Sequence, residues 1–169
     1  MEEKWKSISR LSLIGWLVAY GLFMVHALRD ADGFLLLDHV NLPFHEAGHI
    51  FFTPLGQRMH FLGGTLFQLL VPLALMISFL TKRETTGFAF CLFWLGENFL
   101  NISIYMADAR DLSLPLVGGG VHDWNYLFSH MGLLHKDKAI AGAVKIVGWI
   151  IMVSAPLWLV VRAKTSRGD

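Results

Sequence analysis

The chain alternates between long apolar runs and short polar connections. Four runs carry few or no charges, and each predicts an α-helix long enough to cross about 30 Å of hydrocarbon. They cover residues 11–28, 63–81, 86–107 and 139–161. Lysine and arginine stand near the ends of these runs, where their side chains reach the membrane interface. The pattern therefore predicts one all-α integral membrane domain over residues 1–169.

A fifth apolar segment, residues 34–56, contains six ionisable or amide side chains. They are Asp38, His39, Asn41, His45, Glu46 and His49. Asn41 as N-cap and Pro43 in the first turn predict a helix over residues 42–53, which reaches only about 18 Å. We expect a multi-pass transmembrane bundle of four spanning helices plus this short embedded helix, with five crossings as the alternative. Residues 108–138 are expected to form a polar loop.

Composition supports a membrane protein. The 169 residues are 54% hydrophobic and 16% charged, with a mean hydropathy of +0.52, which exceeds what a soluble core of this size can hide. A net charge of +1 and the absence of a basic cluster argue against a nucleic-acid partner. The expected partner is the lipid bilayer. The single cysteine, Cys91, lies in an apolar run and cannot form an internal disulfide.

The distribution of basic residues predicts an orientation. If residues 42–53 return to their own side, the basic head at residues 4–10, Lys82-Arg83 and the C-terminal tail share one face. By the positive-inside rule that face is cytoplasmic. We therefore expect a protein of the cell membrane with cytoplasmic N- and C-termini.

The most specific chemical signal is His45-Glu46-Ala47-Gly48-His49. On a helix, residues four apart lie on one face, so His45 and His49 can bind one metal ion while Glu46 stands beside it. This H-E-x-x-H spacing is that of zinc hydrolases, in which the glutamate is the general base. The sequence thus predicts Zn²⁺ held by His45 and His49, with Glu46 as the catalytic residue.

A catalytic zinc usually has a third protein ligand, and the helix over residues 86–107 leads to candidates. Glu97, Asn101, Tyr105 and Asp108 form one polar stripe at helical spacing. Ionisable groups at membrane depth indicate function. Asp108 ranks first as the third ligand, because it ends the stripe. Asp111 and Glu97 are alternatives, since Asp111 could pair with Arg110 and Glu97 could be a protonated hydrogen-bond donor.

The connection after this helix offers a further candidate. Three glycines, residues 118–120, precede His122-Asp123. Either member of the pair could be an extra ligand, an oxyanion donor or a partner that orients a ligand. His122 ranks above Asp123 in this interpretation.

The embedded H-E-x-x-H helix, followed two helices later by an aspartate that ends a polar-striped helix, resembles the site-2-protease family of intramembrane zinc metalloproteases. In that family two histidines and a distant aspartate hold zinc, and the glutamate activates water to cleave a membrane-embedded peptide. His45, His49 and Glu46 match directly, and Asp108 matches by position and type. The family's Asp-Gly context and upstream Asn-Pro element are absent here, where Asp108 lies in Tyr-Met-Ala-Asp-Ala-Arg-Asp.

The resemblance implies a membrane-embedded metalloprotease whose zinc-bound water, assisted by Glu46, attacks a membrane protein or peptide substrate. The same metal site could instead hydrolyse a lipid amide or ester. A non-catalytic membrane protein with a structural metal site is the third alternative, and closed coordination by His45, His49, Asp108 and His122 would favour it.

Overall fold

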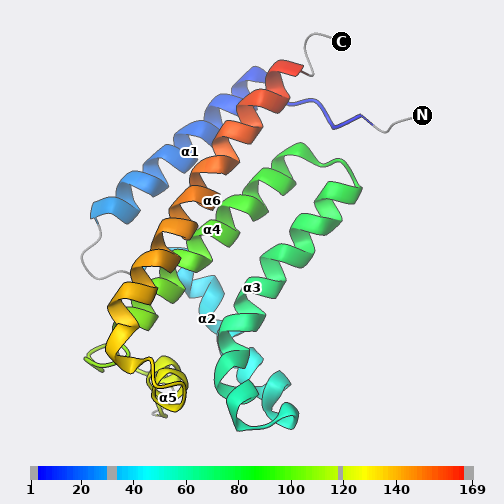
Figure 1. Ribbon diagram of the computed structural model, residues 1–169. Helices are drawn as coiled ribbons and strands as arrows, with labels where there is room; N and C mark the ends of the chain where they lie inside the picture. The colour runs from blue at the N-terminus through cyan, green and yellow to red at the C-terminus, as the bar shows by residue number, and fades with distance from the viewer. Residues whose placement is uncertain (1–3, 30–33, 118–119, 166–169) are drawn as a thin grey trace.

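The computed structural model describes residues 4–29, 34–117 and 120–165, and the described chain is all helical (Figure 1). The prediction of an all-α protein is therefore confirmed. In chain order the α-helices are α1 (Arg10–Arg29), α2 (Asp38–Phe52), α3 (Gln57–Thr81), α4 (Thr85–Ala107), α5 (Asp123–His130) and α6 (Asp137–Thr165). Short 3-10 turns, η1 (Thr53–Leu55) and η3 (Leu134–Lys136), precede α3 and α6.

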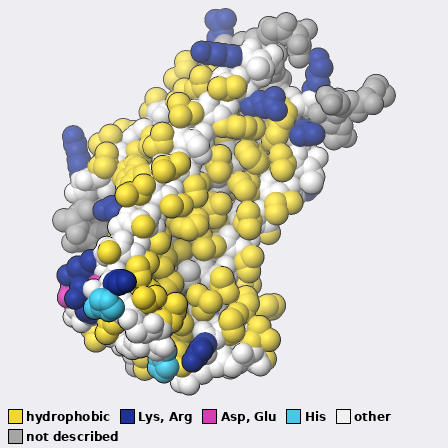
Figure 2. Space-filling view, in the orientation of Figure 1, with side chains coloured by type: hydrophobic (Ala, Val, Ile, Leu, Met, Phe, Trp, Pro, Cys, Tyr) yellow, Lys and Arg dark blue, Asp and Glu magenta, His cyan; other side chains and the backbone are white. Residues whose placement is uncertain are grey.

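Four helical segments are long and apolar enough to cross a membrane, as the sequence predicted. They are α1, α3, α4 and the continuous segment from Leu134 to Thr165 that contains α6. Their outward surfaces are apolar, and Figure 2 shows this apolar covering along the length of the molecule. Lipid is the medium in which such a surface is stable.

Helices α4 and α6 pack closely along their length because two glycines meet at their contact. A Cβ atom on Gly148 would lie 2.9 Å from the Gly96 carbonyl oxygen, and one on Gly96 would overlap the backbone of Met152. Small residues let helix backbones approach in a membrane, where van der Waals contact replaces the hydrophobic effect. Helix α1 lies against this pair, with Tyr20 stacked on Phe93 at 4.5 Å.

A second glycine contact joins α2 to α3. A Cβ atom on Gly63 would lie 2.6 Å from the Gly48 carbonyl oxygen, so neither position has room for a side chain. Gly48 belongs to the H-E-x-x-H segment, and this contact fixes the face that α2 presents to the bundle. With 15 residues, α2 covers about 22 Å.

Helix α2 begins at Asp38, four residues before the predicted start. Asn41 is inside the helix and buried, so its expected role as N-cap is wrong. Its amide nitrogen donates to Asp38 Oδ1 at 3.1 Å and to Glu97 Oε2 at 2.8 Å. Trp94 Nε1 donates to its carbonyl oxygen at 2.7 Å. Asn41 therefore joins α2 to α4 through a buried polar network.

The segment predicted as a polar loop contains a helix. Trp124, Leu127 and Phe128 of α5 are buried, and their i, i+3, i+4 spacing places them on one face. They pack with Phe61 of α3 and Ile102 of α4. Helix α5 thereby closes the end of the bundle that lies away from both termini (Figure 1).

Candidate metal centre

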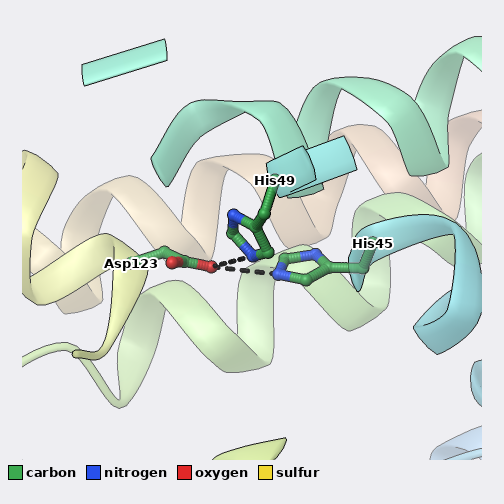
Figure 3. A group of neighbouring side chains, drawn as sticks. All are labelled: His45, His49 and Asp123. Carbon is green, nitrogen blue, oxygen red and sulfur yellow. Dashed lines mark hydrogen bonds and ion pairs between the residues drawn. The ribbon is translucent and has the colours of Figure 1, made fainter. Parts of the chain in front are cut away.

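Helix α2 projects both histidines of the H-E-x-x-H segment toward the first residue of α5. His45 Nε2 lies 2.9 Å and His49 Nε2 lies 3.3 Å from the same oxygen, Asp123 Oδ2 (Figure 3). One ligand atom from each residue lies within 4.8 Å of the others, so the three could hold one metal ion. Their side chains are 12%, 14% and 6% exposed, respectively.

The other nitrogen of each imidazole already has an acceptor. His45 Nδ1 lies 2.8 Å from Gln68 Oε1, and His49 Nδ1 lies 2.8 Å from the His60 carbonyl oxygen. The Gln68 amide is oriented in turn, because its nitrogen donates to Asn101 Oδ1 at 3.2 Å. These acceptors favour the tautomer with Nδ1 protonated, which leaves the Nε2 lone pairs directed at the shared oxygen.

This arrangement fits a divalent cation. Two Nε2 atoms can both hydrogen-bond the Asp123 carboxylate only if each imidazole carries a second proton, which places two positive charges beside one negative charge. One divalent metal ion bound among the same three atoms replaces both protons. A metal-binding imidazole usually donates its other ring N–H to an acceptor, as the Nδ1 atoms of His45 and His49 are placed to do. Two histidines and one carboxylate are a common ligand set of catalytic zinc.

The charge state of the carboxylate is suited to this role. Burial alone would raise the pKa of Asp123, but the hydrogen bonds to His45 and His49 hold it below its ordinary value. An ionised carboxylate is the form that binds a metal. Tyr105 also contacts this residue, because its hydroxyl oxygen accepts the Asp123 backbone N–H at 3.2 Å.

Asp108, the first choice from sequence, does not join the two histidines. Its carboxylate closes the turn after α4 by accepting the backbone N–H and hydroxyl of Ser113 at 2.9 and 2.5 Å. It also accepts the Leu114 N–H at 3.1 Å. Burial raises the pKa of Asp108, and these hydrogen bonds more than offset that effect, so the pKa lies below its ordinary value. The structure thus places Asp123, not Asp108, at the histidines.

The sequence-based alternatives have other partners. Asp111 pairs with Lys138 at 2.8 Å on the surface, and Glu97 joins the network of Asn41. His122 caps α5, where its Nδ1 accepts the Asn125 N–H at 3.2 Å. Its Nε2 lies 3.4 Å from Asp108 Oδ2. Burial lowers the pKa of His122.

Two of the four residues in the predicted polar stripe of α4, Asn101 and Tyr105, contact the groups of the candidate metal centre. Asn101 orients the Gln68 amide, and Tyr105 holds the backbone of Asp123. The sequence indicated that these groups share one face of α4, and it assigned the third ligand to Asp108 at the end of the same helix. The sequence does contain a pattern that points to Asp123. Trp124, Leu127 and Phe128 have the spacing of one apolar helix face, and Asp123 stands at the start of that helix.

A cavity of about 460 Å³ opens beside His45. His45 and Glu46 lie in its wall with Gln68, Asn101 and Tyr105. The rest of the lining contains one further carboxyl residue, Asp38, and is otherwise apolar, from residues Phe34, Leu42, Ile104, Leu114, Pro115, Leu116 and Val117. The general base predicted from sequence therefore faces the space in which a substrate could lie next to the metal ligands.

Comparison with known proteins adds no family to this description. No family model, curated protein or solved structure matches the chain.

Proposed function

We propose that the protein is a membrane-embedded zinc-dependent hydrolase, most directly a metallopeptidase that cleaves a membrane-associated peptide. His45, His49 and Asp123 hold the metal and Glu46 is the general base. The observation that carries the proposal is the convergence of two imidazole Nε2 atoms on one buried carboxylate oxygen, beside a cavity walled by Glu46.

Three protein ligands favour a catalytic site over a structural one, because structural zinc sites are closed by four. A zinc ion with an open position lowers the pKa of a water to about 7 and polarises a carbonyl. Glu46 takes the proton from that water and later delivers it to the leaving nitrogen of the peptide. The apolar part of the cavity wall accommodates an apolar side chain next to the bond to be cut.

A peptide must be extended to react, because the carbonyls of a helix are already hydrogen-bonded. Leu114, Pro115 and Leu116 line the cavity and belong to neither a helix nor a strand. We propose that the substrate lies along this segment. Gly118 and Gly119, two of the three glycines that precede His122 in the sequence, lie outside the described residues.

Metal analysis of the protein purified in detergent tests the centre. We expect about one zinc per chain in the wild type and none in His45→Ala/His49→Ala. The proposal would be rejected if the purified wild-type protein contained no metal and its stability did not change when zinc was added.

The activity is tested in liposomes with quenched fluorescent peptides that span the bilayer, and in parallel with an N-acyl amide lipid and an ester lipid. Glu46→Gln is expected to retain zinc and lose turnover by a factor of 10² or more. Asp111→Asn, on the surface, is the matched control and should retain full activity. If only the lipids are hydrolysed, the protein is a lipid hydrolase and not a peptidase. Unchanged turnover in Glu46→Gln would reject the role of Glu46 as general base.

A further inference from the structure

Tyr105 is a polar residue of the cavity wall that has no role in the metal binding or proton transfer proposed above. Its side chain lies in the same wall as His45 and Glu46. The ring contacts two imidazoles, His45 in a T-shaped arrangement at a centroid distance of 5.9 Å and His122 in a tilted arrangement at 4.1 Å. These contacts fix the direction in which the phenol points.

The hydroxyl is tied to the metal centre through a single lone pair. Its oxygen accepts the backbone N–H of Asp123 at 3.2 Å, and within the described residues this is its only hydrogen bond. Because the Asp123 N–H is the donor, the phenolic proton is not consumed by that contact. It remains available to a second acceptor.

We propose that Tyr105 is a catalytic residue that donates a hydrogen bond to the substrate carbonyl oxygen as negative charge develops there. The inference rests on the proposed hydrolase function. Attack of water on a carbonyl carbon moves the π electrons to the carbonyl oxygen, and a donor fixed in advance stabilises that charge without reorganisation. Tyr105 transfers no proton in this role, and Glu46 handles the proton of the water.

A purely structural role would have a different signature. If Tyr105 only positioned Asp123, loss of the hydroxyl would weaken metal binding. If it acts on the developing oxyanion, metal binding stays and interaction with a negatively charged oxygen ligand weakens. The variant Tyr105→Phe separates these cases, because it keeps the ring between His45 and His122 and removes only the hydroxyl.

The test uses cobalt-substituted protein and acetohydroxamate, so it needs no known substrate. Co²⁺ reports its coordination in the visible spectrum, and acetohydroxamate brings an anionic oxygen to the metal. We expect Tyr105→Phe to bind Co²⁺ with wild-type affinity and acetohydroxamate at least tenfold more weakly. In the peptide assay its kcat should fall by 10²- to 10³-fold with KM changed less than threefold.

Tyr126→Phe is the control, because Tyr126 stacks on Phe61 at 4.0 Å and does not line the cavity. It should match the wild type in all three measurements. Unchanged acetohydroxamate affinity and kcat in Tyr105→Phe would overturn the inference while leaving the metal centre intact, and so would loss of Co²⁺ from this variant. Failure of the wild type to bind Co²⁺ would instead overturn the proposed function.

Discussion

At the scale of single residues, the proposed metal site depends on one oxygen atom. Asp123 Oδ2 is the point on which both histidines of α2 converge, although 74 residues separate Asp123 from His49 in the chain. The two nearby carboxylates, Asp108 and Asp123, are both ionised and buried but have different partners. Asp108 organises a turn, and Asp123 faces the imidazoles.

Paired substitutions distinguish the two carboxylates. Asp123→Ala should lower zinc affinity by a factor of 10² or more, because it removes one of three ligands. Asp108→Ala should retain zinc and lower the free energy of unfolding by about 1–3 kcal/mol, since it leaves the Ser113 and Leu114 donors unpaired. Zinc titration and thermal unfolding of both variants measure this. Zinc loss restricted to Asp108→Ala would restore the sequence-based ligand set.

Gly64 makes room for the His45 ring. A Cβ atom there would lie 2.6 Å from His45 Nε2 and 2.7 Å from Cε1, so Gly64→Ala should push the imidazole off its position. We expect zinc affinity to fall 10- to 100-fold, as for other changes that misorient a ligand. Gly15→Ala, where nothing lies within 4 Å, should leave zinc affinity unchanged. Equal affinity in both variants would contradict the geometry.

Part of the site was predictable from the sequence and part was not. H-E-x-x-H spacing is a local property of a helix, so His45, His49 and Glu46 could be predicted. The third ligand depends on where α5 docks, which is a long-range contact, and a stripe on one helix does not reveal it. Asn41 has the residue type of an N-cap, but a bond to Glu97 of another helix decided its place.

At the scale of helices, the bundle is built from two glycine-mediated pairs. The pair α2–α3 carries the histidines and the groups that orient them, and the pair α4–α6 contributes most of the buried apolar cluster around Met152 and Leu159. The positions of the apolar helices followed from the length of the apolar runs. Their pairing did not, because in a membrane small residues select the contact and glycine occurs on exposed faces as well.

Gly96→Ala should destabilise the α4–α6 pair. Its Cβ would meet the Met152 backbone, which cannot move as a flexible side chain does. We expect about 1–3 kcal/mol of lost stability, in the range of overpacking. Gly142→Ala on α6 has nothing within 4 Å and gains helix propensity, so it should be neutral or stabilising. Unfolding in detergent micelles measures both, and equal stability would show that the contact is looser than described.

At the scale of the whole molecule, the start of α1 and the end of α6 lie at one end of the bundle, and α5, which begins with Asp123, lies at the other (Figure 1). Trp5 lies between the guanidinium groups of Arg83 and Arg162, at 5.6 and 5.0 Å from its ring centroid. We propose that this end faces the cytoplasm by the positive-inside rule. The metal centre then lies toward the outer side of the membrane.

Cysteine labelling tests this orientation in a Cys91→Ala background. Both Lys82, in the turn between α3 and α4, and His135, in η3, are exposed. A membrane-impermeant maleimide added to intact cells should label His135→Cys and leave Lys82→Cys unlabelled until the cells are permeabilised. The reverse labelling would place the metal centre on the cytoplasmic side.

The buried network of Asn41 also bears on how the chain enters the membrane during synthesis. Helix α4 carries Glu97 and Asn101, which are costly to insert alone into lipid. Their partners, Asn41 and Gln68, belong to α2 and α3 and are therefore translated first. When α4 leaves the ribosome, acceptors and donors for its polar groups already exist in the nascent bundle. The order of the helices thus supplies partners for Glu97 and Asn101 before α4 enters the membrane.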